Sequence, residues 1–161
     1  MSTDIYTGAD GAIVLSAPQN TEGEAAQGVL DQFELAAVGR VQDVRVEVTT
    51  AVRAYHEIGQ RYATELRPGN VTVRGTIGRA YVNGAMIGLM LGEARTGRPA
   101  GNWAHPALNI TLRLANPASG LVNTLTLHDV KLESWVYDLP EDEFVMEKVG
   151  FQALYLTVAE E

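Results

Sequence analysis

The sequence has no cysteine, few aromatic residues and no long apolar run. Because none of its 161 residues is Cys, disulfides, thiolate metal sites and thiol nucleophiles are excluded. The first ten residues, MSTDIYTGAD, lack the basic start and the apolar stretch of a signal peptide. No apolar stretch approaches the roughly 20 residues that span a bilayer. We therefore expect a cytoplasmic protein that does not insert into a membrane and whose fold is held by packing alone.

The usual signatures of enzymes are also missing. None of the four serines lies in a G-x-S-x-G motif, and no phosphate-binding glycine loop is present. His56, His105 and His128 are far apart in the sequence, and none has a partner at metal-ligand spacing. The consecutive acids 141–143 are typical of a solvated turn and not of a carboxylate pair for glycoside hydrolysis. We predict no catalytic residue, no metal site, no cofactor and no enzymatic activity.

Basic residues are scarce at both ends of the chain. The formal net charge is −8; six acids and no base precede Arg40, and from Leu114 onward nine acids face only Lys131 and Lys148. Residues 41–113 reverse this, with nine arginines against five acids. The dominant basic surface that nonspecific DNA binding requires is not predicted. The segregated charges indicate either a solvated surface without a specific role, or head-to-tail docking of the Arg-rich block of one copy on the acidic ends of another.

What the sequence does contain is a period-two alternation of apolar and polar residues. It runs through residues 42–52, 71–78 and 107–115, and each of these segments is predicted to be a β-strand. With 46% hydrophobic residues, the chain can cover one contiguous core. We therefore expect one mainly β domain over residues 1–161.

The second half of the chain predicts unusually long strands. A turn at 116–120 leads into the β-prone stretch 121–139, and after a polar turn at 140–143 the segment 144–158 predicts one long terminal strand. The alternation changes face near His128-Asp129, which predicts a β-bulge. Strands average about 5–6 residues, so these lengths need a reason. Two compatible reasons are a tall barrel wall and a strand that is bent by a bulge so that it serves two sheets.

Two segments have helical spacing instead. Residues 80–92 predict one short buried helix that ends at Gly92, and Thr21 with Glu24 matches a capping box ahead of a Gly-interrupted helix near 21–30. Pro68-Gly69-Asn70 is typical of a type II turn before a strand.

Residues 53–66, RAYHEIGQRYATEL, follow neither period. They favour either a short helix or irregular connection packed on its own domain, or an extended loop whose aromatic residues anchor an interface, because Tyr and Arg are enriched at such sites. On the second interpretation the candidate subunit-interface residues are Arg53, Tyr55, Ile58, Arg61, Tyr62 and Arg67.

The order of these segments resembles the phage tail-tube family over residues 40–158. A strand ending in Glu47-Val48-Thr49 runs into a loop, then come LRPGN (66–70), the strand VTVRGTIGRAY (71–81) with its Gly75, and the short helix. Residues 131–156, KLESWVYDLPEDEFVMEKVGFQALYL, resemble the final hairpin of the family, in which an acidic, Pro-containing turn precedes a strand with the pattern M-E-x-V-x-F.

The resemblance implies a β-sandwich or barrel with one short flanking helix. It also implies six-subunit rings that stack into a tube, with long hairpins joining an intersubunit barrel that lines the lumen. We accordingly expect an N-terminal arm at about 1–40, a stacking loop at about 53–69 and a helix at about 80–92. Candidate lumen or barrel-face residues are Glu47, Thr49, Thr72 and Arg74.

The implied function is that of a structural virion protein, assembled in the host cytoplasm into the inner tube of a phage tail. Its partners would be itself, the sheath, tape-measure, baseplate and tail-terminator proteins, and DNA that passes during ejection without specific binding. A tube protein of a secretion or injection system is the alternative. The sequence does not distinguish a contractile tail from a non-contractile one. A small-ligand-binding β-barrel is a less favoured class, because only 7% of the residues are aromatic.

Overall fold

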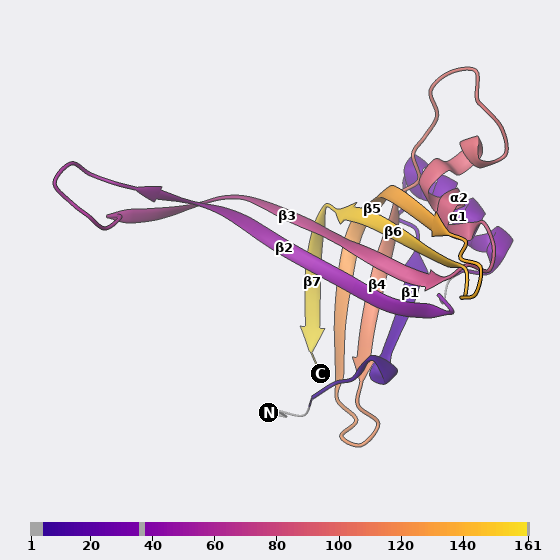
Figure 1. Cartoon of the computed structure of the whole chain (residues 1–161), viewed down its shortest axis with the longest axis horizontal. Helices are drawn as coiled ribbons and strands as arrows, with labels where there is room; N and C mark the ends of the chain where they lie inside the picture. The colour runs from indigo at the N-terminus through magenta and orange to yellow at the C-terminus, as the bar shows by residue number, and fades with distance from the viewer. Residues whose placement is uncertain (1–4, 36–37, 161) are drawn as a thin grey trace.

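The computed structural model describes residues 5–35 and 38–160, and within them the fold is mainly β (Figure 1). The strands are β1 (Gly11–Ser16), β2 (Val41–Tyr55), β3 (Glu65–Ala80), β4 (Leu108–Ala115), β5 (Val122–Asp138), β6 (Met146–Ala153) and β7 (Tyr155–Glu160). The helices are α1 (Thr21–Phe33) and α2 (Ala85–Leu91), with short 3-10 turns at Gly8–Asp10 and Gly92–Arg95. The strands predicted at 42–52, 71–78, 107–115 and 121–139 are confirmed, and β2 and β3 are longer than the sequence alternation indicated.

The strands form one antiparallel sheet that curls into a half-barrel. Its order is β1-β4-β5-β6-β3-β2, with β7 paired to β5 beside β6. The first half of β5 pairs with β4 and β7, and its second half pairs with β6. The change falls at Asp129, which has a left-handed φ of 51° at a register shift. The predicted bulge is therefore confirmed, and so is the strand that bends to serve two parts of the sheet.

The hydrophobic core lies between the concave side of the sheet and the two helices (Figure 1). Strand β5 supplies Leu127, Val130 and Leu132, and helix α2 supplies Met86 and Leu89; all five are at most 1% exposed. Helix α2 packs on both α1 and β5.

The prediction of an N-terminal arm at 1–40 is wrong for most of these residues. The helix that the sequence indicated near 21–30 is present as α1, in addition to the one flanking helix that the resemblance implies. Residues 11–16 pair with β4 along their whole length, and α1 carries buried Ala26, Val29 and Leu30. These residues lie inside the domain because their apolar side chains complete the core. Residues 1–4 of the expected arm lie outside the described part of the chain.

Helix α1 begins one residue earlier than its capping box predicts. Asn20 has an extended backbone, and its Oδ1 accepts a hydrogen bond of 2.7 Å from the Gly23 N–H. Asn20 is therefore the N-cap, and Thr21 is the first residue of the helix. Helix α2 is shorter than the predicted 80–92, because Ala80 still belongs to β3. Its predicted end is confirmed, since Gly92 is the C-cap with a φ of +61°.

The long terminal strand predicted over 144–158 is two strands with a break at Leu154. The Leu154 N–H donates to the carbonyl of His128 over 2.9 Å, at the bulge of β5. The chain therefore bends between β6 and β7 where β5 bends. Strand β7 pairs with the first half of β5 and β6 with the second half, so together they follow β5 along its length.

Candidate assembly surfaces

The hairpin of β2 and β3 extends far beyond the rest of the sheet (Figure 1). β3 pairs with β6 only from Val73 to Ala80, so residues 65–72 have β2 as their only described strand partner. The predicted stacking loop at 53–69 is wrong in its bounds: residues 53–55 and 65–69 are paired strand, and only 56–64 form the tip. The type II turn predicted at 68–70 is likewise wrong, because these residues lie within β3, opposite a register shift at Thr50/Val52.

The tip of this hairpin exposes apolar side chains that no described residue covers. Ile58 is 106% exposed, Tyr62 89% and Tyr55 59%. The backbone of the tip is ordered internally, since the Thr64 N–H donates to the Tyr55 carbonyl over 2.9 Å and the Thr64 hydroxyl donates to Glu57 over 3.1 Å. The structure thus gathers all six candidate interface residues on one exposed element: Arg53, Tyr55, Ile58, Arg61, Tyr62 and Arg67.

Two arginines lie directly opposite each other in the hairpin. Arg53 pairs with Arg67 across the strands, and Tyr55 pairs with Glu65 one step further on the same face. Arg67 makes a salt bridge of 3.5 Å with Glu65. Like charges opposite each other are unfavourable in a sheet, so carboxylates from outside the subunit would stabilise this pair.

The four candidate lumen residues lie side by side on one face of the sheet. Glu47 pairs with Arg74 and Thr49 with Thr72. Their neighbours Val46, Val48 and Val73 point to the other face, because side chains alternate along a strand. Val73 and Val46 reach the core there, whereas Val48 is 50% exposed. The four residues therefore share one face of the β2–β3 pair.

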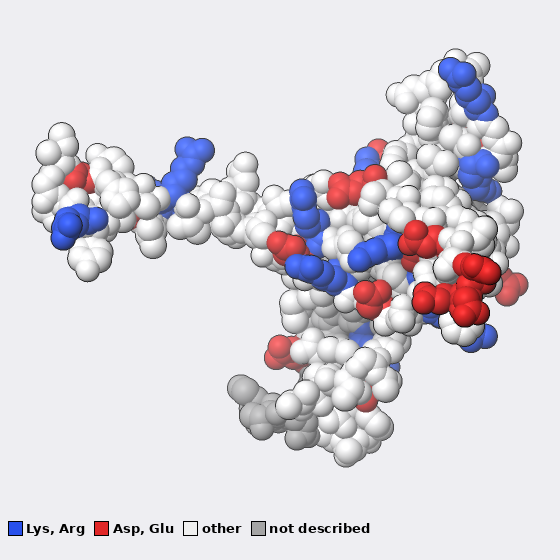
Figure 2. All heavy atoms as spheres, in the orientation of Figure 1, with Lys and Arg blue, Asp and Glu red and all other residues white. Residues whose placement is uncertain are grey.

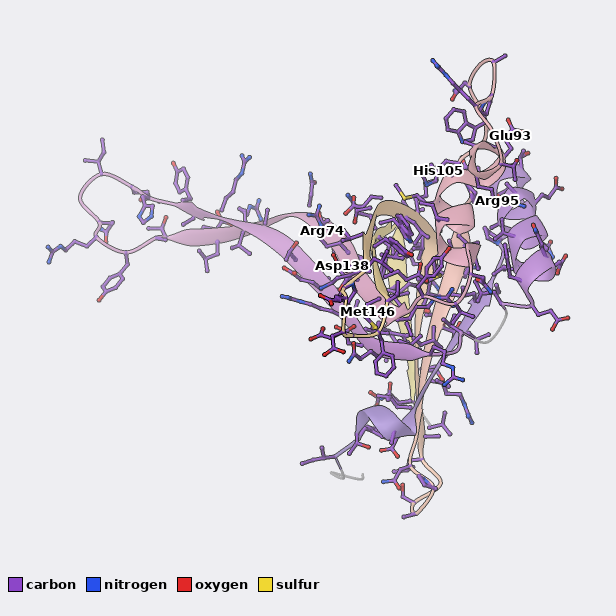
Figure 3. The ribbon with its side chains drawn as sticks, turned by 45° about the vertical axis from the view of Figure 1, so that its right-hand side comes forward. Arg74, Glu93, Arg95, His105, Asp138 and Met146 are labelled. Atoms are coloured by element: carbon purple, nitrogen blue, oxygen red, sulfur yellow. The ribbon has the colours of Figure 1, made fainter. Side chains whose placement is uncertain are left out.

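The same polar face continues across β6 and the second half of β5. Gln152 pairs with Arg74, Lys148 with Gly78 and Met146 with Asp138. Figure 3 shows Arg74, Asp138 and Met146 together on this side of the molecule, away from Glu93, Arg95 and His105 near α2. Figure 2 shows basic and acidic side chains interleaved over β2 and β3. The face is therefore polar and mixed in charge, without a block of one sign.

Strands β2, β3, β6 and β5 form a four-stranded part of the sheet that has two unpaired edges. The outer edge of β2 has no described strand partner, and residues 132–138 of β5 pair only with β6. Neither edge is blunted by a proline within the strand. Unpaired edges of this length are templates for pairing with another chain.

A groove opens on the core side of the β2 edge. It has a volume of about 510 Å³ and lies between the start of β2 and the strands β1, β4 and β5. Its apolar lining comes from Ile13, Val38, Val41, Val44, Leu112, Leu114 and Leu125. Arg40, Asp43 and Arg113 are the charged residues at this groove. Sequence reasoning missed it, because residues from four separate segments form it.

The titratable groups on the helix side of the sheet have structural partners. Buried Arg79 and Glu147 form an ion pair of 2.5 Å, Trp135 Nε1 donates to Glu147 over 2.9 Å, and Arg79 also reaches Asn83. His105 hydrogen-bonds to the Leu132 carbonyl over 3.1 Å. Among the described residues no three His, Asp or Glu side chains gather as a metal site. This network ties β3, β5 and β6 to the start of α2.

His128 and His56 differ in their surroundings. The His128 ring stacks on Tyr155 and hydrogen-bonds to Thr157 over 3.0 Å, whereas His56 is exposed at the hairpin tip.

In the part of the chain that the structure describes, no helix has the length and apolar content to cross a membrane.

No protein-family model matches the sequence, and the comparison with curated proteins finds no match either. Solved structures match over the whole fold. The tube-terminating cap of the anti-feeding prophage has a TM-score of 0.67 at 11% identity, with 100% of this chain and 95% of that chain covered. A chain of the PVC sheath-tube complex, an extracellular contractile injection system, has a TM-score of 0.65 at 9% identity and coverages of 99% and 94%.

The SPP1 tail tube is also similar, with a TM-score of 0.62 at 13% identity, over 98% of this chain and 80% of that chain. These identities are too low to carry function, but the coverage shows that the whole chain, including β1 and α1, takes part in the shared architecture. The chain has the tail-tube fold.

Proposed function

We propose that this protein is a structural subunit that assembles into rings of six, which stack into the inner tube of a phage tail. The observation that carries the proposal is the four-stranded sheet β2-β3-β6-β5, whose two edges are both unpaired in the described chain. In a ring, the β2 edge of one copy pairs with the β5 edge of the next. A closed barrel then lines the lumen and no edge stays open.

The strand directions suit this closure. Successive strands in the order β2, β3, β6, β5 are antiparallel, so β2 and the second half of β5 run in opposite directions. A rotation about the tube axis keeps strand directions, so β2 of one copy meets an antiparallel β5 of its neighbour. A heterologous contact that closes by rotation gives a ring. An odd number of strands would have forced a parallel junction in an otherwise antiparallel barrel.

The β2–β3 hairpin provides the contact between stacked rings. A two-stranded ribbon alone in water is marginal at best, and this one exposes Val48, Val52, Leu66 and Val71 along its length by 50% or more. Neighbouring copies would cover these side chains. Each hairpin makes a modest contact, and several copies per ring make the joint strong.

The polar face with Glu47, Thr49, Thr72 and Arg74 then lines the lumen, and DNA passes without being gripped. Duplex DNA carries one negative charge per ~1.7 Å, so a basic lumen would bind it and slow its passage. The mixed signs on this face and the net charge of −8 per chain oppose such binding. The subunit itself catalyses nothing and holds no cofactor.

A second candidate is the tube of an injection particle. It is favoured by the likeness to the prophage cap and to the PVC sheath-tube chain. The matches cover 95% and 94% of those two chains, against 80% of the SPP1 chain. Both readings assign the protein to the tail of a particle assembled in a host cytoplasm, with tape-measure, baseplate and terminator proteins as partners, and a sheath if the tail contracts. Particles purified with this subunit would contain nuclease-protected DNA if they are virions, and would lack it if they are injection particles.

Size-exclusion chromatography and negative-stain microscopy of the purified protein test the proposal. We expect hexamers at low concentration, and rings or tubes at high concentration or with tail partners. A monomer or dimer that forms neither under any of these conditions would contradict the proposal and favour a ligand-binding barrel. As a separate test of the lumen, duplex DNA should show no mobility shift at moderate salt, and strong salt-sensitive binding would refute a lumen that does not grip DNA.

A further inference from the structure

The groove beside β2 and the turn between β5 and β6 have complementary surfaces. The groove is apolar and carries Arg40 and Arg113 against the single acid Asp43. The turn, residues 139–145, carries three exposed acids at 141–143 (Figure 2) and exposed Leu139 and Phe144. Within the described residues, none of these arginines and acids forms an ion pair.

We propose that the groove is the socket for the β5–β6 turn of the neighbouring copy in the same ring. The inference rests on the ring assembly proposed above and assigns the pair of surfaces that closes it. Acidic residues 141–143 of one copy would lie against Arg40 and Arg113 of the next, while Leu139 and Phe144 enter the apolar part of the groove. This gives the segregated charges of the sequence a specific docking role.

Strand register brings the two surfaces to the same end of the ring. Across the sheet, Asp138 at the end of β5 pairs with Met146, which pairs with Ala80, and the adjacent Arg79 pairs with Val41 at the start of β2. The turn that follows Asp138 and the groove beside Val41 therefore lie at one axial end, and rotation about the axis keeps them there. When the β5 edge of one copy pairs with the β2 edge of the next, the turn lies over the groove.

The side chains at the end of β5 and in the turn after it also fit a contact with the groove. Tyr137 is stacked on Trp135 at 5.4 Å, on the core side of the sheet where Trp135 reaches Glu147, and it is still 40% exposed. Leu139 is 71% exposed and Phe144 85%. The groove residues on the receiving copy are themselves only partly buried. Both apolar surfaces are thus incomplete in one chain and complete each other across the junction.

The hairpin tip is the other candidate for the socket, because it too has exposed apolar residues. It lies at the opposite end of β2 from the groove, so it would reach the groove only from a stacked ring. Its charges also complement the basic groove less well than those of the turn. Glu57 in the tip is balanced by Arg61, whereas the charged residues of the turn are all acidic. We therefore assign the socket to the turn, and a crosslink from residue 42 to either residue 144 or residue 58 separates the two assignments.

Engineered cysteines test the contact cleanly, because the natural chain has none. Single variants Gln42→Cys, in the groove, and Phe144→Cys, in the turn, are mixed and oxidised. We expect a crosslinked dimer that neither variant forms alone, and a ladder of crosslinked species from the double variant. Ile58→Cys mixed with Gln42→Cys is the matched control, and we expect no crosslink between this pair.

Charge reversal gives a second, independent test. Arg40→Glu with Arg113→Glu in one chain, and Glu141→Lys with Glu143→Lys in another, should each prevent ring formation. Mixed together, they should form rings in which the two variants alternate, because each junction then pairs opposite charges. The recovery in the mixture also shows that both variants fold.

The outcomes distinguish this inference from the assembly it rests on. If the unmodified protein forms no rings, the proposed function fails. If it forms rings but residues 42 and 144 do not crosslink, or both charge-reversed variants assemble alone, the socket is wrong. A crosslink between residues 42 and 58 instead would give the groove to the hairpin of a stacked ring and overturn the assignment.

Discussion

Strands β2 and β3 each have one half inside the body of the domain and one half outside it. In the body, Ile77 and Val73 of β3 are at most 4% exposed and pack on Phe151 and the rest of the core. In the hairpin, Val52 and Leu66 of the same two strands are 59% and 64% exposed. In β2 the alternation of apolar and polar residues extends beyond the body to Val52, yet only the half in the body has something to pack against.

The difference separates stability from assembly along the same pair of strands. The body has a buried core, a buried ion pair and helices that cover it, so it can hold its shape alone. The hairpin has backbone pairing and little else, so it gains its apolar contacts only from other copies. Substitutions in the body should therefore lower the free energy of unfolding of the subunit, and substitutions in the hairpin should change assembly instead.

The largest effect on subunit stability is expected at the buried ion pair. Glu147→Ala leaves the Arg79 guanidinium buried without its carboxylate, and removes the acceptor of Trp135 Nε1. We expect the free energy of unfolding to fall by about 3–5 kcal/mol, measured by urea unfolding at low protein concentration. The double variant Arg79→Met, Glu147→Leu removes both charges and should recover most of the loss. A double variant no better than Glu147→Ala would show that the ion pair is not the source of the effect.

The alternation predicted strands within β2, β3 and β4 but missed β1, and it could not predict which halves of β2 and β3 are buried. Val44, Val46 and Val48 continue the same pattern toward Val52, and nothing in the sequence marks where the core ends. The turn predicted at Pro68-Gly69-Asn70 is wrong because Pro68 and Val71 both pair with β2, so the chain continues β3 through a register shift at this point. Tertiary pairing overrides local turn propensity here.

The candidate site was predicted in part for a related reason. Glu47 and Arg74 each lie in a segment where apolar and polar residues alternate, so pairing of the two strands places both side chains on the same face. The groove beside β2 joins residues from β1, β4 and β5 and from 38–44, and no local pattern links them. Helix α1 was weakly indicated because Gly23 and Gly28 interrupt it. It forms because Ala26, Val29 and Leu30 are buried in the core.

A smaller loss is expected where the hairpin leaves the body. A Cβ on Gly75 would lie 2.1 Å from the Arg45 carbonyl oxygen and 2.7 Å from Phe151 Cζ. Gly75→Ala therefore forces β2 or Phe151 to move, and we expect it to cost about 1–3 kcal/mol in urea unfolding. Gly28→Ala is the matched control: a Cβ there meets nothing within 4 Å, and on the exposed face of α1 it should stabilise the subunit by up to about 1 kcal/mol. Equal effects of the two variants would contradict this account.

The N-cap of α1 should contribute still less. Asn20→Ala removes the acceptor of the Gly23 N–H and should lower the free energy of unfolding by about 1 kcal/mol. Asn20→Asp keeps the acceptor and should be close to neutral. Thr21→Ala separates the observed cap from the one the sequence suggested. A larger loss for Thr21→Ala than for Asn20→Ala in thermal unfolding would restore the capping box.

The smallest effect on subunit stability, and the largest on assembly, is expected at the hairpin tip. Tyr55 and Tyr62 are exposed, and neither ring packs on another described aromatic ring. Replacing both by Ala should leave the free energy of unfolding within about 0.5 kcal/mol of the original, as for surface substitutions elsewhere. Rings should still form, because the β2 and β5 edges are untouched. Tubes should not grow, because each stacking contact loses its two aromatic anchors and the loss recurs at every hairpin of a ring. Negative-stain microscopy measures this as rings without tubes.

Val14→Ala is the control, since Val14 is also exposed but lies on β1, away from the hairpin, and tubes of this variant should grow normally. Tubes of ordinary length from the Tyr55→Ala, Tyr62→Ala variant would place the stacking contact elsewhere. Loss of rings as well as tubes would mean that the hairpin holds the ring and not the stack, so the division between a stable body and an assembling hairpin would have to be drawn at the sheet edges instead.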